Sequence, residues 1–449
     1  MKLDSSALTL RLTEHALGLC ADGVPARATQ LAKQCLLDWL AVTLAGSRAA
    51  LVAILEADLP CGEGGVATVL GYRGRRALYD AALLNGTSSH ALDYDDVNYA
   101  LMGHPTVPVM PALLALAERE GASGAALIEA FIAGYEFECR VGLAMAHGLY
   151  GQGFHATATV GALGAALACA RLLRLDTLTA AHAIGIAVTQ AAGLKSMFGT
   201  DCKPLQAGNA ARIGLQSACL AARGFKSRTD SLECAQGFAA THTDTFKAEA
   251  ALMTPPDGLY LYANLFKYHA SCYETHATIE SCRKLREHPD FELSEIAAVR
   301  VEVNSYCDKI CNIQAPRSGL EAKFSLRQTA AFALFGLDTG NPQLFGEEIV
   351  NGAEIQACRE RVKIALSEAI PALHAVVTVT LKSGALLRAT HDASQPAGDL
   401  DAQALRLQHK FRSLVEPLAG REVATRIIEQ VDTLERSPNL AGLLSAITF

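Results

Sequence analysis

The stretch Pro255-Pro256-Asp257-Gly258 divides the chain into two parts with different hydrophobic patterns. Proline lacks a backbone donor and glycine favours turns, so this run ends any helix that reaches it. Before it, from residue 5 to about residue 250, apolar residues recur at the spacing of one helix face, as at Leu40 and Leu44. The pattern predicts one large all-α domain over residues 1–258.

The helical segments of this domain are rich in alanine and glycine in their later part. Glycine inside a helix costs about 1 kcal/mol relative to alanine, so close packing between helices is the expected compensation. The candidate helices are residues 77–90, 108–119, 123–147, 155–173, 178–196 and 205–223.

Strand patterns appear after the breaker, where apolar and polar residues alternate. The expected strands are 296–303, 374–381 and 386–390, and the expected helices between them are 322–336 and 344–360. The last two strands are joined through Lys382-Ser383-Gly384, which predicts a hairpin with glycine in its turn. A smaller α+β domain is therefore predicted over residues 259–398.

The helical pattern returns in residues 399–449. We expect this tail to pack back on the first domain and to make that domain discontinuous. The predicted fold class is mostly α: a large all-α helical domain in two pieces, with a smaller α+β domain inserted between them.

The composition is that of an ordinary globular enzyme, with 449 residues, 50% of them hydrophobic and 19% charged. The net charge is −7 and no basic run occurs, so no nucleic-acid partner is expected. The most lipid-like stretch, residues 157–173, contains Arg171 and is short for a membrane span. We therefore expect a buried helix there and no membrane partner.

The thirteen cysteines are scattered singly, without a Cys-x-x-Cys pair, and the closest two are Cys307 and Cys311. An odd number without paired spacing is typical of reduced thiols. The opening residues 1–5 lack the apolar core of a secretory signal. These features predict a cytoplasmic protein.

The stretch from Ser88 to Asp96, followed by Gly103-His104-Pro105, concentrates ionisable groups in an apolar sequence. Three carboxylates (residues 93, 95 and 96) and two imidazoles (residues 90 and 104) fall within fifteen positions. Charges near an apolar core are costly unless they are paired, so the cluster indicates a polar pocket for proton transfer. The alternative is a solvated acidic loop between two helices.

Three further segments carry reactive groups. Gly151-Gln-Gly-Phe-His155 delivers a histidine to a helix start, and Lys203 precedes a proline at another helix entry. Residues 266–276 contain Lys267, Ser271, Cys272 and His276. Each has a structural alternative: a partly exposed imidazole, a solvated lysine, and a polar interface network without a catalytic role.

Metal and cofactor sites are not expected. Asp93, Asp95 and His104 are groups that can bind a hard cation, but their spacing matches neither an EF-hand nor His-Glu-x-x-His. The chain has no Gly-x-Ser-x-Gly elbow and no Gly-x-Gly-x-x-Gly after a strand. We therefore expect neither a serine nucleophile of that type nor a nucleotide cofactor.

Taken together, these motifs resemble the MmgE/PrpD family, over nearly the whole chain and in order. They are His-Ala-Leu-Asp-Tyr-Asp-Asp (90–96), Gly-His-Pro (103–105), Gly-Phe-His (153–155), Cys-Lys-Pro-Leu-Gln-Ala-Gly (202–208), Lys-Tyr-His-Ala-Ser-Cys-Tyr-Glu-Thr-His (267–276) and Ala-Lys-Phe-Ser (322–325). The resemblance implies a large helical domain, a small α+β lid with the site between them, a homodimer, and no metal or organic cofactor.

The resemblance also implies site residues and a substrate class. The catalytic positions of the family match Asp93, His104, His155 and Lys203. The residues expected to bind substrate are Lys267, Ser271, Cys272 and His276. Family substrates are small anionic polycarboxylates, which lysines hold by charge-assisted hydrogen bonds. Imidazoles titrate near neutral pH and so suit proton transfer, which predicts a bell-shaped pH dependence.

The leading hypothesis is a cofactor-independent lyase similar to 2-methylcitrate dehydratase, which abstracts a proton α to a carboxylate. The alternatives are an epimerase similar to iminodisuccinate epimerase, an enzyme similar to cis-aconitate decarboxylase, and, last, a non-catalytic binding protein. Val97 stands where lyases of the family often have threonine, which favours the epimerase because a departing hydroxyl needs a proton donor. The tyrosine that the decarboxylase would place before Pro316 has no counterpart at that spacing.

Overall fold

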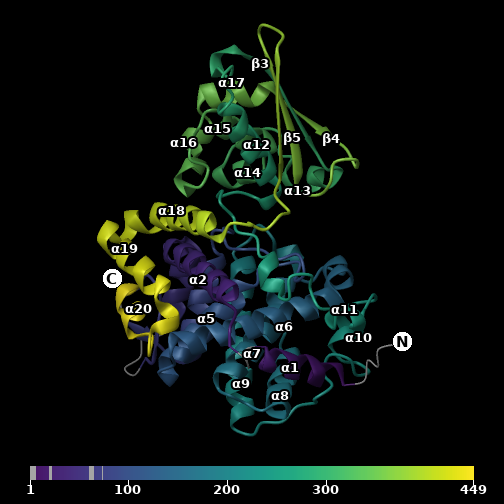
Figure 1. The fold of residues 1–449 in the computed structure, drawn as a ribbon, viewed down its shortest axis with the longest axis vertical. Helices are drawn as coiled ribbons and strands as arrows, with labels where there is room; N and C mark the ends of the chain where they lie inside the picture. Colours follow the sequence, from purple (N-terminus) through teal and green to yellow (C-terminus); the bar gives the residue numbers. More distant parts are fainter. Residues whose placement is uncertain (1–6, 20–22, 60–64, 73) are drawn as a thin grey trace. The chain divides into compact units, whose positions relative to one another are not determined.

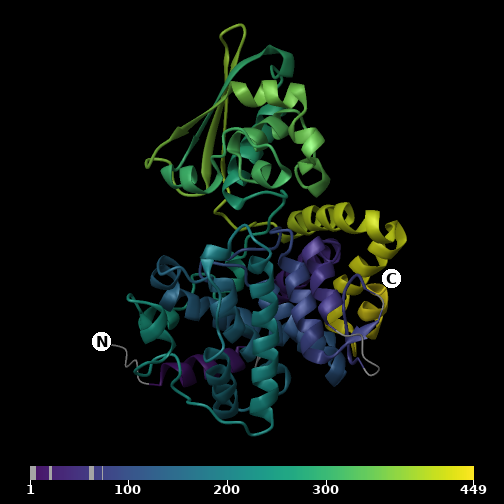
Figure 2. The same cartoon turned by 180° about the vertical axis from the view of Figure 1, so that it is seen from behind.

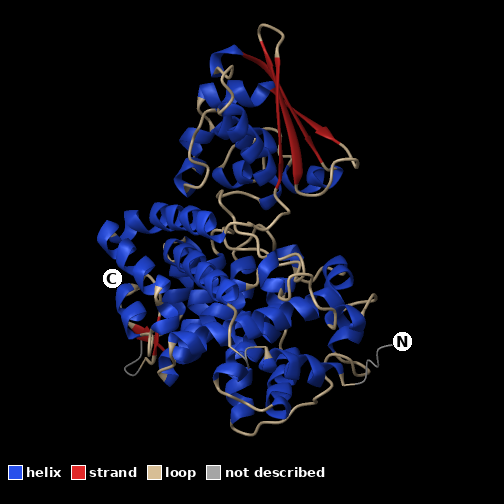
Figure 3. Cartoon of the chain, viewed as in Figure 1, coloured by secondary structure: helices blue, strands red, loops and turns tan. Residues whose placement is uncertain are grey.

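The computed structural model describes residues 7–19, 23–59, 65–72 and 74–449. Residues 1–5, on which the expectation of no secretory signal rests, lie outside the described residues. The chain folds as two units, residues 1–266 with 399–449 and residues 267–398 (Figure 1). The predicted fold class is confirmed: the first unit is helical and the second combines helices with a sheet (Figure 3).

The sequence assigns residues 259–266 to the second domain, whereas the structure places them in the first unit. Their backbone is tied to that unit by hydrogen bonds. The Leu261 N–H donates to Glu136 Oε1 at 2.8 Å, and Leu265 forms an antiparallel bridge with Val97. The breaker at 255–258 therefore ends the long helices without ending the unit.

The first unit is built around helices that are apolar on every side. Its elements are α1 (Leu8–Gly18), α2 (Ala26–Gly46), α3 (Ala50–Asp58), β1 (Ala67–Thr68), β2 (Arg75–Arg76), α4 (Leu78–His90), α5 (Thr106–Glu120), α6 (Gly124–Gly151), α7 (Ala156–Leu172), α8 (Thr177–Val188), η1 (Lys195–Met197), α9 (Cys202–Ala222), α10 (Phe238–His242), α11 (Ala248–Ala251), η2 (Tyr260–Ala263), α18 (Leu400–Ala419), α19 (Arg421–Asp432), η7 (Leu434–Arg436) and α20 (Ala441–Ala446).

Helix α7 is buried from Ala156 to Ala170 and packs against α6 and α9. A helix that is apolar all round belongs inside a core. The glycines allow the close approach that the composition predicts: a Cβ at Gly214 of α9 would lie 2.4 Å from Ala165 Cβ of α7. Similarly, a Cβ at Gly208 would lie 2.4 Å from the Leu83 carbonyl oxygen of α4. Helices α4 and α7 therefore both pack directly on α9, which carries Lys203, while Asp93 follows the end of α4 and His155 precedes the start of α7.

The C-terminal tail returns to the first unit, as expected from its pattern. Helix α18 packs along α2, and α19 packs on α18, so the C-terminal segment completes the core around α2 (Figures 1 and 2). Within the described residues, no single helix is both long and apolar enough to cross a membrane, and α2 and α3 meet that test only jointly, across an 82° bend.

The second unit contains a four-stranded sheet in the order β4-β3-β5-β6, with helices packed on it. Its elements are η3 (Tyr273–Thr275), α12 (His276–Arg286), η4 (Leu293–Glu295), β3 (Ile296–Val303), η5 (Ser305–Cys307), α13 (Asp308–Cys311), α14 (Gly319–Lys323), α15 (Leu326–Leu334), η6 (Pro342–Phe345), α16 (Glu347–Val350), α17 (Ala353–Arg361), β4 (Val362–Leu366), β5 (His374–Leu381) and β6 (Leu386–Asp392).

The three predicted strands are present, and β5 and β6 form the expected hairpin with Gly384 at φ 86° in its turn. The fourth strand, β4, was not predicted. It follows α17 without a turn and pairs only with β3, in parallel, so that Ile364 lies opposite Val301. The predicted helix over 344–360 is instead divided into η6, α16 and α17.

Candidate active site

The loop after α4 places two of its carboxylates beside the last residue of that helix. His90 ends α4, and its Nδ1 lies 2.9 and 3.0 Å from the two carboxylate oxygens of Asp95. The chain returns through Asp93, which adopts a left-handed φ of 50° and donates its N–H to the His90 carbonyl at 3.2 Å. Aspartate tolerates this conformation better than most residues. The turn thus brings Asp95 back over the helix end.

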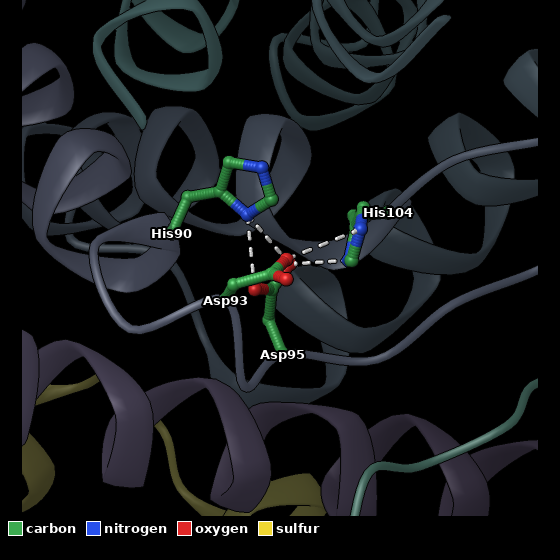
Figure 4. A group of neighbouring side chains, drawn as sticks. All are labelled: His90, Asp93, Asp95 and His104. Atoms are coloured by element: carbon green, nitrogen blue, oxygen red, sulfur yellow. Dashed lines mark hydrogen bonds and ion pairs between the residues drawn. The ribbon is translucent and has the colours of Figure 1, made fainter. Parts of the chain in front are cut away.

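His104 approaches Asp95 from the other side (Figure 4). Its Nδ1 lies 2.8 Å from Asp95 Oδ2, and its backbone N–H donates to Thr157 Oγ1 of α7 at 3.0 Å. A Cβ at the preceding residue, Gly103, would lie 2.8 Å from that hydroxyl, so glycine permits the contact. Asp95 therefore lies between two imidazoles.

Asp95 is an anion that orients both rings. Its side chain is fully buried, which alone would raise the pKa, but His104 and His90 beside it hold the pKa of Asp95 well below its usual value. A carboxylate accepts hydrogen bonds only, so the nitrogens that face it carry protons. This assigns the Nδ1–H form to His90 and to His104.

His90 is neutral at physiological pH. Burial lowers the pKa of His90 from 6.5 to about 4, and the attraction of Asp95 offsets only part of that effect. With its proton on Nδ1, the ring presents a lone pair at Nε2. Within the described part of the chain, this buried Nε2 has no hydrogen-bond partner. His90 therefore has the form of a base or an acceptor.

Lys203 supplies the positive charge of the cluster. It lies in the first turn of α9, and its Nζ is 2.6 Å from Asp93 Oδ1. His104 Nε2 lies 3.8 Å from the same oxygen. The Asp93 side chain is 33% exposed, whereas Asp95 is 2% exposed, so Asp93 and Lys203 form the more open edge of the cluster.

His155 is held by a different partner. It is the N-cap residue of α7, and its Nδ1 lies 2.8 Å from Gln206 Oε1. The Gln206 amide nitrogen donates to the Leu194 carbonyl at 3.2 Å, which turns the amide oxygen toward His155. Burial, followed by His90 and Lys203, keeps the pKa of His155 well below 6.5. His155 is therefore neutral, with its proton on Nδ1 and a lone pair on Nε2.

The three imidazoles form one cluster. The ring centroids of His90 and His104 are 4.7 Å apart, and those of His90 and His155 are 5.8 Å apart. Phe198 contacts His155 edge-on at 5.0 Å, and Lys203 Nζ lies 5.3 Å from the Phe198 ring. An ammonium, two carboxylates and three fixed imidazoles thus meet in one region of the first unit.

The predicted catalytic residues of this unit come together, and two residues that the prediction omitted lie at their centre. Asp93, His104 and Lys203 form direct contacts, while His155 reaches them through His90. The omitted residues are His90 and Asp95. Both stand in the stretch that the sequence singled out, but the turn that joins them across a helix end has no local sequence signature. Since His90, Asp95 and Asp96 are each 1% exposed, the alternative of a solvated acidic loop is wrong.

The same groups are the candidate ligands for a cation. His90, Asp93, Asp95 and His104 can each offer one atom within 4.8 Å of the others. However, the Lys203 ammonium already neutralises Asp93, and Asp95 accepts a hydrogen bond from His90 and lies 2.8 Å from His104 Nδ1. A metal ion bound through Asp93 and the ring nitrogens that face Asp95 would have to displace Lys203 and the protons on those nitrogens. The arrangement as it stands suits proton transfer.

The four predicted substrate-binding residues lie in the second unit. The Ser271 hydroxyl bonds to that of Thr275 at 2.8 Å, and the Cys272 thiol donates to Glu274 Oε2 at 2.7 Å. His276 Nε2 lies 3.2 Å from the His269 carbonyl oxygen, and burial keeps the pKa of His276 well below 6.5. Lys267 is buried. Their role in binding substrate stays a prediction.

Comparison with known families finds two family domains in order along the chain, the second of which extends past residue 398 into the tail that the structure places in the first unit. The MmgE/PrpD N-terminal domain matches residues 10–251, and the MmgE/PrpD C-terminal domain matches residues 269–436. The chain belongs to the MmgE/PrpD family. The resemblance drawn from the motifs is thereby confirmed.

Three similar proteins are named cis-aconitate decarboxylase. The cis-aconitate decarboxylase of Aspergillus terreus (strain NIH 2624 / FGSC A1156) is 30% identical over 353 residues, which span 73% of this chain and 72% of that protein. The Homo sapiens cis-aconitate decarboxylase is 27% identical over 372 residues, 79% of this chain and 76% of that protein. The Mus musculus enzyme is 25% identical over 371 residues, 79% and 75% of the two chains.

Proposed function

We propose that the protein is a cofactor-independent lyase that acts on a small di- or tricarboxylate. The observation that carries this proposal is the buried Asp95, bonded to His90 and close to His104, next to the Lys203–Asp93 ion pair. Lys203 provides a charge-assisted partner for a substrate carboxylate. The lone pairs at Nε2 of neutral imidazoles can take a proton from the carbon next to that carboxylate.

Asp95 gives His104 its catalytic form. The carboxylate holds the proton on Nδ1, so Nε2 is free to accept, and it stabilises the imidazolium once Nε2 is protonated. A positioned acid–base group of this kind contributes roughly 10²- to 10⁴-fold to the rate. His155, held neutral by burial and by Gln206, provides a second base from a separate helix.

Decarboxylation is the first reaction to test. Three relatives are named cis-aconitate decarboxylase, and decarboxylation asks for no leaving hydroxyl. The bond between one carboxylate and the carbon skeleton breaks, CO₂ leaves, and the electron pair stays on the carbon skeleton. An imidazole that has taken up a proton from solvent then donates it to the resulting carbanion. Dehydration of 2-methylcitrate needs a donor to the departing hydroxyl, and Val97 provides none at the position where the resemblance expects threonine.

Epimerisation is the second candidate, favoured by the same valine. Proton removal and return at one carbon need two bases and no leaving group. His104 and His155 come from separate segments and are joined to one ring cluster through His90. An iminodisuccinate-type substrate fits this arrangement.

The experiment is a panel of three substrates in D₂O with the purified full-length protein. Release of CO₂ from cis-aconitate supports decarboxylation, alkene absorbance from 2-methylcitrate supports dehydration, and deuterium uptake with inversion of iminodisuccinate supports epimerisation. Each active substrate is then tested with Lys203→Met and His104→Ala, which should lose activity by on the order of 10²-fold or more.

Unchanged turnover in both variants would contradict the assignment of the site. No turnover of any of the three, combined with calorimetric binding of a polycarboxylate, would support the binding-protein alternative instead. The exposed Lys382 offers a matched control, since Lys382→Met removes an ammonium in the second unit and should leave turnover unaltered.

A further inference from the structure

The seam between α2 and α18 is polar along one face. Residues 30, 34 and 38 of α2 are one helical turn apart and so lie on the same side. Each meets a residue of α18: Gln30 with Asp401 at 2.7 Å, Gln34 with Gln403 at 2.7 Å, and Asp38 with Lys410 at 2.6 Å. The seam therefore fastens the C-terminal tail to the N-terminal part of the first unit.

The last pair of the seam differs from the others because it reaches the candidate active site. The Lys410 ammonium donates to Asp38 and also to the Tyr94 carbonyl oxygen at 2.7 Å. The same nitrogen lies 3.9 Å from the centroid of the Tyr94 ring. Lys410 is only 4% exposed, a degree of burial that lysine almost never has unless it is paired.

Tyr94 stands between the two carboxylates of the cluster. The carbonyl that Lys410 holds belongs to the peptide that joins Tyr94 to Asp95, and Asp93 precedes it with its left-handed φ of 50°. A backbone in a sparsely populated region persists only when its surroundings fix it on both sides. The His90 carbonyl fixes the loop before Tyr94, and Lys410 fixes it after.

We propose that Lys410 is a positioning residue for the candidate active site. Through the Tyr94 carbonyl, its ammonium holds the loop so that Asp93 faces Lys203 and Asp95 faces the two imidazoles. Asp38 then serves as the counter-ion that allows an ammonium to be buried there. The kinetic part of this inference rests on the proposed function, whereas its structural part does not.

Two variants separate positioning from simple charge balance. Lys410→Met keeps the length of the side chain and removes the hydrogen bonds to Asp38 and to the Tyr94 carbonyl, but it takes the Lys410 ammonium away from the buried Asp38 carboxylate. The double variant Asp38→Asn with Lys410→Met removes that charge as well. We expect the double variant to regain stability but not turnover, with kcat lower by roughly 10- to 100-fold and little change in KM.

The matched control is Gln403→Leu, which breaks the same seam at one of its other two pairs, away from the loop. This variant should lose stability and keep kcat. Recovery of kcat in the double variant would overturn the inference, because Lys410 would then act only by neutralising Asp38. An equal loss of kcat in Gln403→Leu would overturn it too, since the seam as a whole would be responsible.

Hydrogen–deuterium exchange tests the structural part without any substrate. The backbone amides of residues 91–98 should exchange faster in the double variant than in the unaltered protein, and Gln403→Leu should leave them unchanged. If exchange rises as expected while no substrate is turned over, the proposed function fails and the positioning role stands. If exchange in residues 91–98 is the same in all three proteins, the positioning role is refuted whatever the activity.

Discussion

Substitution of His90 by glutamine tests the protonation state on which the site depends. The pKa of His90 is about 4 in the folded protein, and it takes the ordinary histidine value of 6.5 in the unfolded chain. As the pH falls between these values, the unfolded chain takes up a proton that the folded chain does not, so the folded state loses stability. From about pH 7.5 to about pH 4.5 this residue should lower the free energy of unfolding by about 2–3 kcal/mol.

His90→Gln removes that dependence, since its amide does not titrate. The variant should be less stable than the unaltered protein at neutral pH, where it loses packing, and should recover about 2–3 kcal/mol relative to it at about pH 4.5. Trp39, the only tryptophan, is buried in α2 of the same unit, so its fluorescence during urea unfolding reports on this unit alone. His409→Gln, at an exposed position of the same unit, is the control.

The opposite sign would refute the assignment. If His90 were instead a charged partner of Asp95, its pKa would lie above 6.5, and the ion pair would stabilise the folded state most at low pH. The variant would then fall further behind as the pH decreased. If the difference in free energy of unfolding between the two proteins is the same at both pH values, the pKa of His90 does not differ between the folded and unfolded states. The assignment of a neutral tautomer to His90 would then be refuted.

Three further predictions follow from single contacts. Gln206→Glu places a carboxylate against His155 Nδ1 and so raises the pKa of His155. Turnover should therefore fall at neutral pH, and the acidic limb of the pH–rate profile should move to higher pH. If that limb does not move, His155 does not take part in the proton transfer. Dialysis against a chelator should leave turnover intact, whereas added Zn²⁺ should inhibit by binding to His90, Asp95 and His104. Loss of turnover on treatment with the chelator would contradict a proton transfer that needs no metal ion. Gly208→Ala places a methyl group 2.4 Å from the Leu83 carbonyl oxygen, so urea unfolding should show a loss of roughly 1–3 kcal/mol, and an unchanged midpoint would contradict the close approach of α4 and α9.

Helices and strands with a strong local hydrophobic pattern were predicted well. Elements that form only by pairing with another segment of the chain were not. Strands β3 and β5 have the predicted bounds because alternation of apolar and polar residues is readable in one strand alone. Strand β4 has no such alternation and becomes a strand only by pairing with β3. The helix over 178–196 ends early, at Val188, where the chain turns toward η1.

The candidate site shows the same contrast. The chemical types of its groups, two carboxylates, a lysine and histidines in an apolar helical chain, are properties of the residues and were visible from the motifs. The contacts between these groups could not be read from the motifs, since Lys203 bonds to Asp93 from 110 positions away in the sequence. The expectation that Lys267 of the second unit adds to the same site stays a prediction.

By itself, the sequence determined the family, the helical character of the first unit and the acid–base nature of its reactive groups, because periodicity and side-chain chemistry are local. The tertiary structure alone decided that Asp95 is ionised, that His90 and His155 are neutral with lone pairs at Nε2, and that Lys410 supports the loop from 316 positions away. Protonation depends on burial and on neighbouring charges, and both arise only when distant segments pack together.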